Sequence, residues 1–424
     1  MAFTESDARR ARLDFPALTR TRDGRSLAYL DGPAGTQVPE AVIEAVAAYY
    51  RTANANTHGQ FVTSRESDAE ILRAREAMAA FLGAPSWREI SFGANMTTLA
   101  FSLAHAFGRL FEPGDEVVVT QLDHEANRGP WLALAQRGVV VREVPLASGG
   151  PEGTLEPGGF AARIGPRTRL VAAGLASNAL GTVTDLAPVR DLCREVGAWL
   201  LVDAVHYAPH FPLDVAALDP DFLLCSAYKF YGPHVGILYA RPGLLEELPC
   251  DRLRTQEAEA PFRIETGTLN HAALAGVAAA VEYVASWGEG DSPRARVVSA
   301  MEGISAYEHS LARHYAEAVA RVPGVTVRGP GFDEGPRAPT VSITIDGVTP
   351  VEAARRLGER GVQVWDGDFY AVRPIEALGL AERGGVVRTG ISLYSTRDEV
   401  ERLVEGVAEI AAAPSPAGPA AVTA

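Results

Sequence analysis

A regular alternation of short apolar segments and helical patterns, between about Glu40 and Trp287, limits the fold of this chain more than any other feature. Helical stretches such as 126–137 and 187–196 lie between several of the apolar segments. Apolar strands that alternate with helices indicate an α/β fold, in which helices cover both faces of a largely parallel sheet. The expected strands are EVVVT (116–120), VVVREVPL (139–146), RLVAAGLAS (169–177), WLLVDAVH (199–206), FLLCSAYK (222–229) and GILYAR (236–241).

A change of composition divides the chain. Residues 286–295 (SWGEGDSPRA) are rich in Gly, Ser, Pro and charge, which indicates a domain boundary. Beyond it we expect a long helix around 297–322, strands near 325–328 and 339–345, a helix near 350–360, and a final helix from about 397. The sequence therefore predicts a large domain over 30–287 and a smaller α/β domain over 288–412. We expect residues 1–29 to pack with the small domain and the low-complexity tail over 413–424 to be disordered.

Charge and cysteine content exclude several classes of partner. The 39 basic and 53 acidic residues are mixed along the chain and form no basic stripe, which argues against nucleic acid or an anionic membrane as a partner. No apolar run approaches the ~20 residues that span a bilayer, and the N-terminus lacks the apolar core of a signal peptide. The cysteines Cys193, Cys225 and Cys250 lie far apart and suggest no disulfide framework. We expect a cytoplasmic protein.

Two charged side chains end apolar strands, where the loops of an α/β sheet build binding sites. Lys229 ends FLLCSAYK, and burial there would lower the pKa of its amine and free it to form an imine. Asp203 lies toward the end of the strand WLLVDAVH, where a carboxylate could keep a pyridine nitrogen protonated and so make the ring an electron sink. Taken singly, each has a simpler reading: a lysine that reaches solvent, and an aspartate that caps a helix.

A phosphate site is expected where SFGANMTTLAF (91–101) enters a helix. Asn95, Met96 and Thr97 begin this helix, and free N–H groups together with the helix dipole favour a phosphate dianion there. The same residues are also good helix caps. Ser226, three residues before Lys229, could add a hydroxyl group to the phosphate.

Three further residues follow strands and suit contacts with a pyridine ring and an amino acid. His124 could stack on the ring, and Asn178 could donate a hydrogen bond to the ring's phenolic oxygen. Arg388, in VVRTGISLYST, offers the fork that binds a substrate α-carboxylate. Surface or packing roles remain open for each alone, but together with the lysine and aspartate the set describes a pyridoxal 5'-phosphate (PLP) site.

With these residues in place, the chain resembles the cysteine desulfurase and selenocysteine lyase group of the class V aminotransferase superfamily, from about Leu30 to Leu403. The resemblance implies PLP fold type I, with a mostly parallel seven-stranded sheet in the large domain. It also implies that Lys229 is the Schiff-base lysine, Asp203 the pyridinium partner, and His124 the catalytic stacking residue. By the same resemblance the protein is a homodimer in which Thr268 reaches the phosphate of the partner subunit. The matching segments are DHEANRGPW, SNALGT, LVDAVH, SAYK, ETGTLN and RTGISLYST.

The chain departs from this group at three positions. Tyr228 stands where a histidine is common, and His206 stands where desulfurases commonly have glutamine; we expect His206 to contact the cofactor. In VWDGDFYAV (364–372), Tyr370 occupies the place of the desulfurase nucleophile. A tyrosine, with a pKa near 10, cannot hold sulfur as a persulfide. We expect Tyr370 to contribute to substrate binding.

We therefore expect a PLP-dependent lyase that breaks the C–S bond of cysteine or an S-substituted cysteine by β-elimination, giving pyruvate, ammonia and a thiol. Lys229 would remove the Cα proton. The alternatives are a class V aminotransferase or amino-acid epimerase, a desulfurase with a relocated cysteine, and a PLP-binding regulator or sulfur-carrier scaffold without turnover. The pair His206 and His210 has metal-ligand spacing, but Pro209 lies between them, and we expect no metal.

Overall fold

A seven-stranded sheet forms the centre of the computed structural model, which describes residues 2–150 and 152–413. The strand order is β4-β10-β9-β8-β7-β5-β6. Strand β10 runs antiparallel to both of its neighbours, and all other neighbouring strands are parallel, which confirms the predicted α/β class. The strands are β4 (Ile90–Gly93), β5 (Glu116–Thr120), β6 (Val140–Val144), β7 (Thr168–Gly174), β8 (Trp199–Asp203), β9 (Phe222–Ser226) and β10 (Gly236–Ala240).

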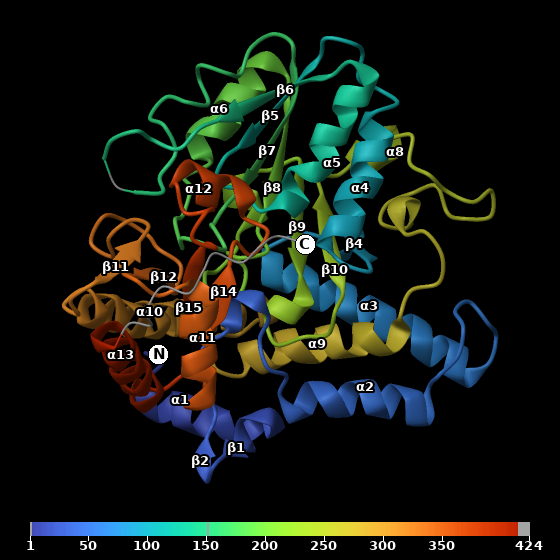
Figure 1. Ribbon diagram of the computed structural model, residues 1–424. Coiled ribbons are helices and arrows are strands. Elements are labelled where there is room, and N and C mark those ends of the chain that lie inside the picture. The colour runs from blue at the N-terminus through green and yellow to red at the C-terminus, as the bar shows by residue number, and fades with distance from the viewer. Residues whose placement is uncertain (1, 151, 414–424) are drawn as a thin grey trace, which may run out of the picture.

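The inner strands of this sheet are buried on both faces, which explains why they read as continuous apolar runs, whereas the edge strand β6 is partly exposed. Along β9, Leu223 and Cys225 point to one face, where they pack against α3 (Val62–Leu82) and α9 (His271–Ala285). Phe222 and Leu224 point to the other face, against α4 (Met96–Phe107). Figure 1 shows α2 (Glu40–Thr52), α3 and α9 side by side below the sheet.

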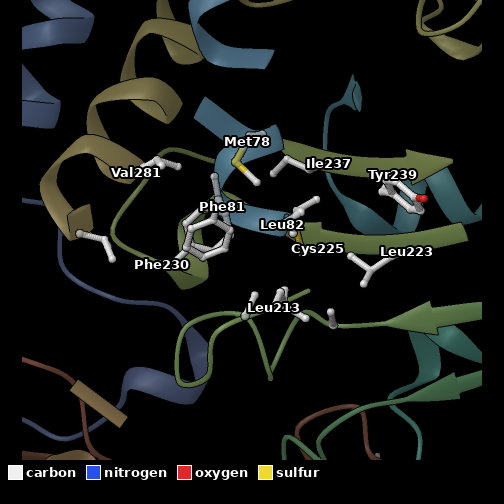
Figure 2. Packing of buried hydrophobic residues seen from close by; sticks show 14 of the residues in the cluster. Met78, Phe81, Leu82, Leu213, Leu223, Cys225, Phe230, Ile237, Tyr239 and Val281 are labelled. Atoms are coloured by element: carbon white, nitrogen blue, oxygen red, sulfur yellow. The ribbon is translucent and has the colours of Figure 1, made fainter. Parts of the chain in front are cut away.

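The core on the α3 side is closely packed. Phe81 of α3 stacks on Phe230, which follows β9, with ring centroids 4.6 Å apart. Figure 2 shows these two rings face to face, with Cys225 close to Leu82 in the same cluster. This packing fixes the position of the β9 end, and with it the chain that carries Lys229.

A second, four-stranded antiparallel sheet follows in the order β11-β12-β15-β14. Its strands are β11 (Val325–Arg328), β12 (Thr340–Ile345), β14 (Trp365–Gly367) and β15 (Val386–Gly390). Helices α10 (Pro293–Val319), α11 (Pro350–Glu359) and α13 (Arg397–Ala412) share its core. The predicted long helix, the two strands, the helix near 350–360 and the final helix are confirmed. The domain boundaries themselves stay a prediction.

The N-terminal residues lie against the second sheet's helices. Helix α1 (Glu5–Ala11) precedes Arg12, which pairs with Glu399 of α13 at 2.8 Å. Strand β3 (Ala28–Tyr29) pairs in parallel with β13 (Val362–Gln363). The remaining elements are β1 (Thr21–Arg22), β2 (Arg25–Ser26), α5 (Gly129–Leu132), α6 (Ala187–Val196), α7 (Val215–Leu218), α8 (Leu244–Glu247), α12 (Val372–Ala377) and short 3-10 turns.

One expectation about an element was wrong, and one strand was missed. The stretch 126–137 is not one helix but a 3-10 turn (Glu125–Asn127), the short α5, and a second 3-10 turn (Ala133–Arg137). Pro130 explains the break, because its ring cannot continue a preceding helix and is tolerated only in the first turn of a new one. Strand β4 was not predicted, because four residues are too short for a clear pattern. Helix α6 matches its predicted bounds, 187–196.

In the part of the chain that the structure describes, no helix is long and apolar enough to cross a membrane. The tail predicted to be disordered lies, beyond Ala413, outside the described residues.

Candidate functional site

The carboxyl ends of β7, β8 and β9 meet the N-terminus of α4 at one cavity. Most of the predicted site residues line it, although they come from segments far apart in the sequence. These residues are Asn95, Met96, Thr97, His124, Asn178, Asp203, His206, Ser226 and Lys229. The cavity lies at the carboxyl edge of the parallel strands, where α/β folds bind ligands.

Lys229 is the only lysine in the sequence. It ends a 3-10 turn (Ala227–Lys229) directly after β9, and its side chain is buried. Burial lowers the pKa of the Lys229 amine to about 7; the nearby charge of Arg388 lowers it further, and Asp203 opposes the shift. The amine donates a hydrogen bond to the carbonyl oxygen of Pro33 and lies 5.0 Å from the centre of the Tyr228 ring. A buried amine that is neutral near pH 7 is suited to nucleophilic and base chemistry.

Asp203 is the last residue of β8 and is buried at the floor of the cavity. Among the described residues, its carboxylate accepts a single hydrogen bond, which the backbone N–H of Val205 donates at 2.9 Å. Burial raises the pKa of Asp203 to about 7, Asp123 raises it further, and Lys229 opposes the shift. A carboxylate with so few partners retains capacity for a cationic N–H group of a ligand.

His124 presents a neutral imidazole to the cavity. Its Nδ1 accepts a hydrogen bond from the backbone N–H of Ala126 at 3.0 Å, which places the ring proton on Nε2. Burial lowers the pKa of His124 to about 4, and the charges of Lys229 and Arg388 act in the same direction. A neutral, buried ring is suited to stacking on a flat ligand.

His206 is also held in a neutral state. Its Nε2 lies 2.9 Å from Oγ1 of Thr340 on β12, and burial lowers the pKa of His206 well below its usual value. The ring of His210 is 5.5 Å away, but Nδ1 of His210 lies 2.7 Å from the buried carboxylate of Glu308. Among the described residues, no three His, Cys, Asp or Glu side chains are placed to hold a metal ion.

The N-terminus of α4 forms the polar end of the cavity. Asn95 caps the helix and accepts a hydrogen bond from the N–H of Thr98 at 2.9 Å, while Ser226 accepts one from the N–H of Met96 at 3.1 Å. Gly236 of β10 packs so closely here that a Cβ atom would lie 2.3 Å from the Asn95 backbone. A helix N-terminus with an adjacent hydroxyl group is a good site for a phosphate dianion.

Arg388 lies on β15, beside the cavity rather than in its lining. Its Nη1 donates to the backbone carbonyl of Asn178 at 2.9 Å, and its guanidinium carbon lies 3.8 Å from the centre of the Phe369 ring. Burial lowers the pKa of Arg388 to about 9, and the nearby Asp31 opposes this. Asn178 donates from Nδ2 to the carbonyl of Phe369 at 3.0 Å, while its buried Oδ1 has no partner among the described groups.

Besides Arg388, two predicted site residues do not line the cavity of their own chain. Tyr370 is 72% exposed, with its ring 5.7 Å from that of His124. Its backbone carbonyl, rather than its hydroxyl, makes the contact with this region, accepting from the N–H of Glu125 at 2.7 Å. Thr268 is exposed on a different surface, next to a groove that includes His58 and Leu253.

None of the three cysteines lines the cavity. Cys225 is fully buried in the sheet core, and burial raises the pKa of its thiol. Burial likewise raises the pKa of Cys193 to about 12, and it raises the pKa of the half-buried Cys250. Thiols held in the protonated form are poor nucleophiles, so no cysteine of this chain resembles a sulfur acceptor at the site.

Sequence reasoning missed three residues near the site. Asp123 lines the cavity and joins the His124 turn to β7 through the N–H of Gly174 at 2.6 Å; burial raises its pKa to about 6. Its position after a strand and next to His124 could have revealed it. Asp31 and Phe369 approach Arg388 from distant segments, and no local sequence signal marks either contact. The sequence also shows that Lys229 is its only lysine.

The profile of the family described as Aminotransferase class-V matches residues 28–403. A cysteine desulfurase from Serratia proteamaculans (strain 568) is 35% identical over 417 residues, which cover 95% of this chain and 97% of that protein. The structure is similar to that of an Escherichia coli cysteine desulfurase, with a TM-score of 0.83, 29% identity, and coverage of 96% of this chain and 98% of that one.

A cysteine desulfurase from Thermococcus onnurineus NA1 gives a TM-score of 0.85 at 27% identity, over 97% of this chain and 99% of that one. Together with the geometry of the cavity, these likenesses place the chain in the aminotransferase class-V family, among relatives of the cysteine desulfurases.

Proposed function

We propose that this chain is a PLP-dependent C–S lyase that cleaves cysteine or S-substituted cysteines by β-elimination. One observation carries the choice of elimination over sulfur transfer: the cavity contains Lys229, Asp203 and a helix N-terminus, but none of the three thiols. Tyr370 occupies the loop where a sulfur-accepting cysteine would be needed. The reaction would consume water and an S-substituted cysteine and release the intact thiol, pyruvate and ammonia.

The residues of the cavity fit the cofactor. The buried Asp203 carboxylate, with one hydrogen bond, can hold a protonated ring nitrogen, and the α4 N-terminus with Ser226 can hold the phosphate. The unpartnered Oδ1 of Asn178 offers a further polar contact. His124, which is neutral, would lie against the ring, and Lys229 is the only ε-amine that could bind the aldehyde. PLP supplies an electron sink that acidifies the Cα–H bond of an amino acid.

Within this arrangement the chain's own groups divide the work. The Lys229 amine, with a pKa of about 7, would be the base that takes the Cα proton. Arg388, whose guanidinium has an unpartnered Nε, would bind the α-carboxylate. Tyr228 and His234 stack with ring centroids 4.6 Å apart and form one wall beside Lys229. A wall of this kind would keep water away from the amine.

A product assay with S-substituted cysteines tests the proposal. Each enzyme preparation would be supplied with S-methyl- and S-phenylcysteine, and the thiol, pyruvate and ammonia would be measured. The proposal predicts equal amounts of all three products, and no turnover in Lys229→Ala.

Other outcomes would contradict it. A requirement for an amino acceptor would instead indicate an aminotransferase. Exchange of deuterium into Cα without products would indicate an epimerase. An enzyme whose visible spectrum responds to no amino acid would indicate a PLP-binding protein without turnover.

We also infer a homodimer with shared sites. Thr268 is exposed and away from its own chain's cavity, and the neighbouring groove carries apolar side chains such as Leu72 and Leu253. Both features suit a partner surface from which Thr268 would reach the other subunit's phosphate. Mixing Lys229→Ala and Thr268→Val subunits tests this: cofactor affinity at the intact Lys229 should recover in mixed dimers. A monomer in sedimentation would contradict it.

A cytoplasmic location remains part of the proposal. It is supported by the three free cysteines, which suit a reducing compartment. Fractionation of the source cells would test it.

A further inference from the structure

The segment 366–371 runs from the end of β14 to the start of α12 and contacts Arg388, Asn178 and Glu125. We call this segment the 366–371 loop. The ring of Phe369 covers Arg388, the Phe369 carbonyl accepts from Asn178, and the Tyr370 carbonyl accepts from the N–H of Glu125, next to His124. Phe369 and Tyr370 both have left-handed backbones, with φ of 58° and 57°. Such a conformation is uncommon outside glycine and is maintained here by the surrounding contacts.

Arg388 is buried, yet its hydrogen bonding is incomplete. Nη1 donates to the carbonyl of Asn178, whereas Nε has no partner. No described carboxylate lies within ion-pair distance, although Asp31 is close enough to act on its charge. A buried guanidinium with an unpaired N–H group can accept an anion as ligand. A carboxylate suits it best, because a planar carboxylate can accept two parallel hydrogen bonds from a guanidinium.

The Phe369 ring contacts the face of this guanidinium and takes none of its N–H groups. The 3.8 Å separation is that of a close cation–aromatic stack. Arg388, Asn178 and Phe369 thus form a closed triangle: Arg388 donates to Asn178, Asn178 donates to Phe369, and Phe369 stacks on Arg388. The triangle fixes the plane of the guanidinium, and the buried Nε has no partner among the described groups.

We propose that Phe369 is a positioning residue for substrate recognition, holding Arg388 in the plane in which it binds the α-carboxylate. The inference rests on the proposed function in taking an amino acid as the ligand. The 366–371 loop then serves binding rather than chemistry. A ligand without a carboxylate gains nothing from the stack.

The test compares two fragments of cysteine by calorimetry on the purified holoenzyme. 3-Mercaptopropionate retains the carboxylate and lacks the amine, and cysteamine retains the amine and lacks the carboxylate. In Phe369→Leu we expect 3-mercaptopropionate to bind roughly 2- to 30-fold more weakly, the range that loss of a cation–aromatic contact represents. Cysteamine should bind as in the wild type. The KM for S-methylcysteine should rise by a similar factor with little change in kcat.

Matched variants separate positioning from general damage. Phe369→Tyr keeps the stack and should restore affinity. Phe332→Leu removes a ring from another buried arginine, Arg337, whose guanidinium lies 4.5 Å from that ring, and should leave both ligands unaffected. Phe369→Met keeps most of the side-chain volume but has no aromatic face. It replaces Phe369→Leu in the test if the leucine variant unfolds at a markedly lower temperature than the wild type.

Three results would overturn the proposal: a wild type that does not bind 3-mercaptopropionate, a Phe369→Leu variant with unchanged affinity, or an equal loss for both ligands. These results are independent of the reaction products. An enzyme that released alanine instead of pyruvate would refute the elimination but leave the role of Phe369 intact.

Discussion

At the scale of single residues, the environment of Lys229 sets the pH at which the site can react. The ordinary pKa of a lysine is near 10.4, whereas burial lowers that of Lys229 to about 7. The neutral fraction of the amine therefore increases as the pH rises through 7. Because Lys229 is the only lysine, no other ε-amine contributes to the signal.

This leads to a direct prediction for the apoprotein. The rate at which it captures PLP covalently should rise with pH, reach half its plateau near pH 7, and be flat by pH 9. Stopped-flow absorbance measures this rate, and Lys229→Ala provides the blank. A rate that still increases between pH 9 and 10 would mean that the amine is an ordinary, solvated one.

The polar residues at strand ends were predictable one by one, while their partners were not. Lys229, Asp203 and Ser226 follow apolar runs, so their place at the edge of a sheet could be read from local sequence. The stack of Phe369 on Arg388 could not be, because it depends on how a loop with left-handed residues meets a separate strand. Local patterns locate the residues that end strands, but loop geometry arises only from the complete fold.

At the scale of elements, the N-terminus of α4 combines a structural cap with the expected phosphate site. Asn95→Ala removes the acceptor for the N–H of Thr98 and should lower the free energy of unfolding by about 0.5–2 kcal/mol. It should also weaken cofactor binding. Ser292→Ala is the matched control, because Ser292 caps α10 in the same way, accepting from the N–H of Ala295.

Urea denaturation and cofactor titration of both variants give the measurement. Both should lose comparable stability, but only Asn95→Ala should lose affinity for PLP. Equal affinities in the two variants would place the phosphate elsewhere.

Elements with strong patterns were predicted well, and short or interrupted ones poorly. All six expected strands exist. Five of them are largely buried, and burial on both faces demands continuous apolar residues; the edge strand β6 is partly exposed. The ends of β7, β8 and β9 were placed too late, since residues 175–177, 204–206 and 227–229 turn away from the sheet and build the site. The stretch 126–137 kept a helical apolar pattern although Pro130 divides it.

At the scale of the whole molecule, a buried ion pair links three distant segments. Arg75 of α3 makes two hydrogen bonds to Glu265, at 2.8 and 2.7 Å, and also donates to the carbonyl of Ile90 on β4. Glu265 additionally accepts from the N–H of Phe92. The pair therefore fixes the segment that leads to Thr268.

Removing one partner leaves the other charge buried and unpaired. We expect Glu265→Gln to lower the free energy of unfolding by about 3–5 kcal/mol. The control is Glu282→Gln, which breaks the exposed pair between Glu282 of α9 and Arg73, a residue of α3 like Arg75. It should lower the free energy of unfolding by at most about 1 kcal/mol. Denaturation midpoints of the two variants measure the difference; similar midpoints would show that the buried pair does not fasten this segment.

The class of the fold and the break between α9 and α10 near 286–295 could be predicted from composition and periodicity. The assembly could not, because the surface around Thr268 carries no local signal of what covers it. Its expected contact with a partner subunit therefore came from the resemblance, and only the fold reveals the exposed apolar side chains of the groove beside it.

Turnover of L-cysteine distinguishes the two reactions, because a desulfurase and an elimination enzyme both accept it but convert it differently. After turnover, products would be quantified and the intact protein weighed by mass spectrometry. We expect pyruvate, ammonia and sulfide, with no added sulfur on Cys193, Cys225 or Cys250. Alanine together with a sulfur atom on one of these cysteines would contradict it, and would mean that a thiol remote from the cavity reaches the substrate.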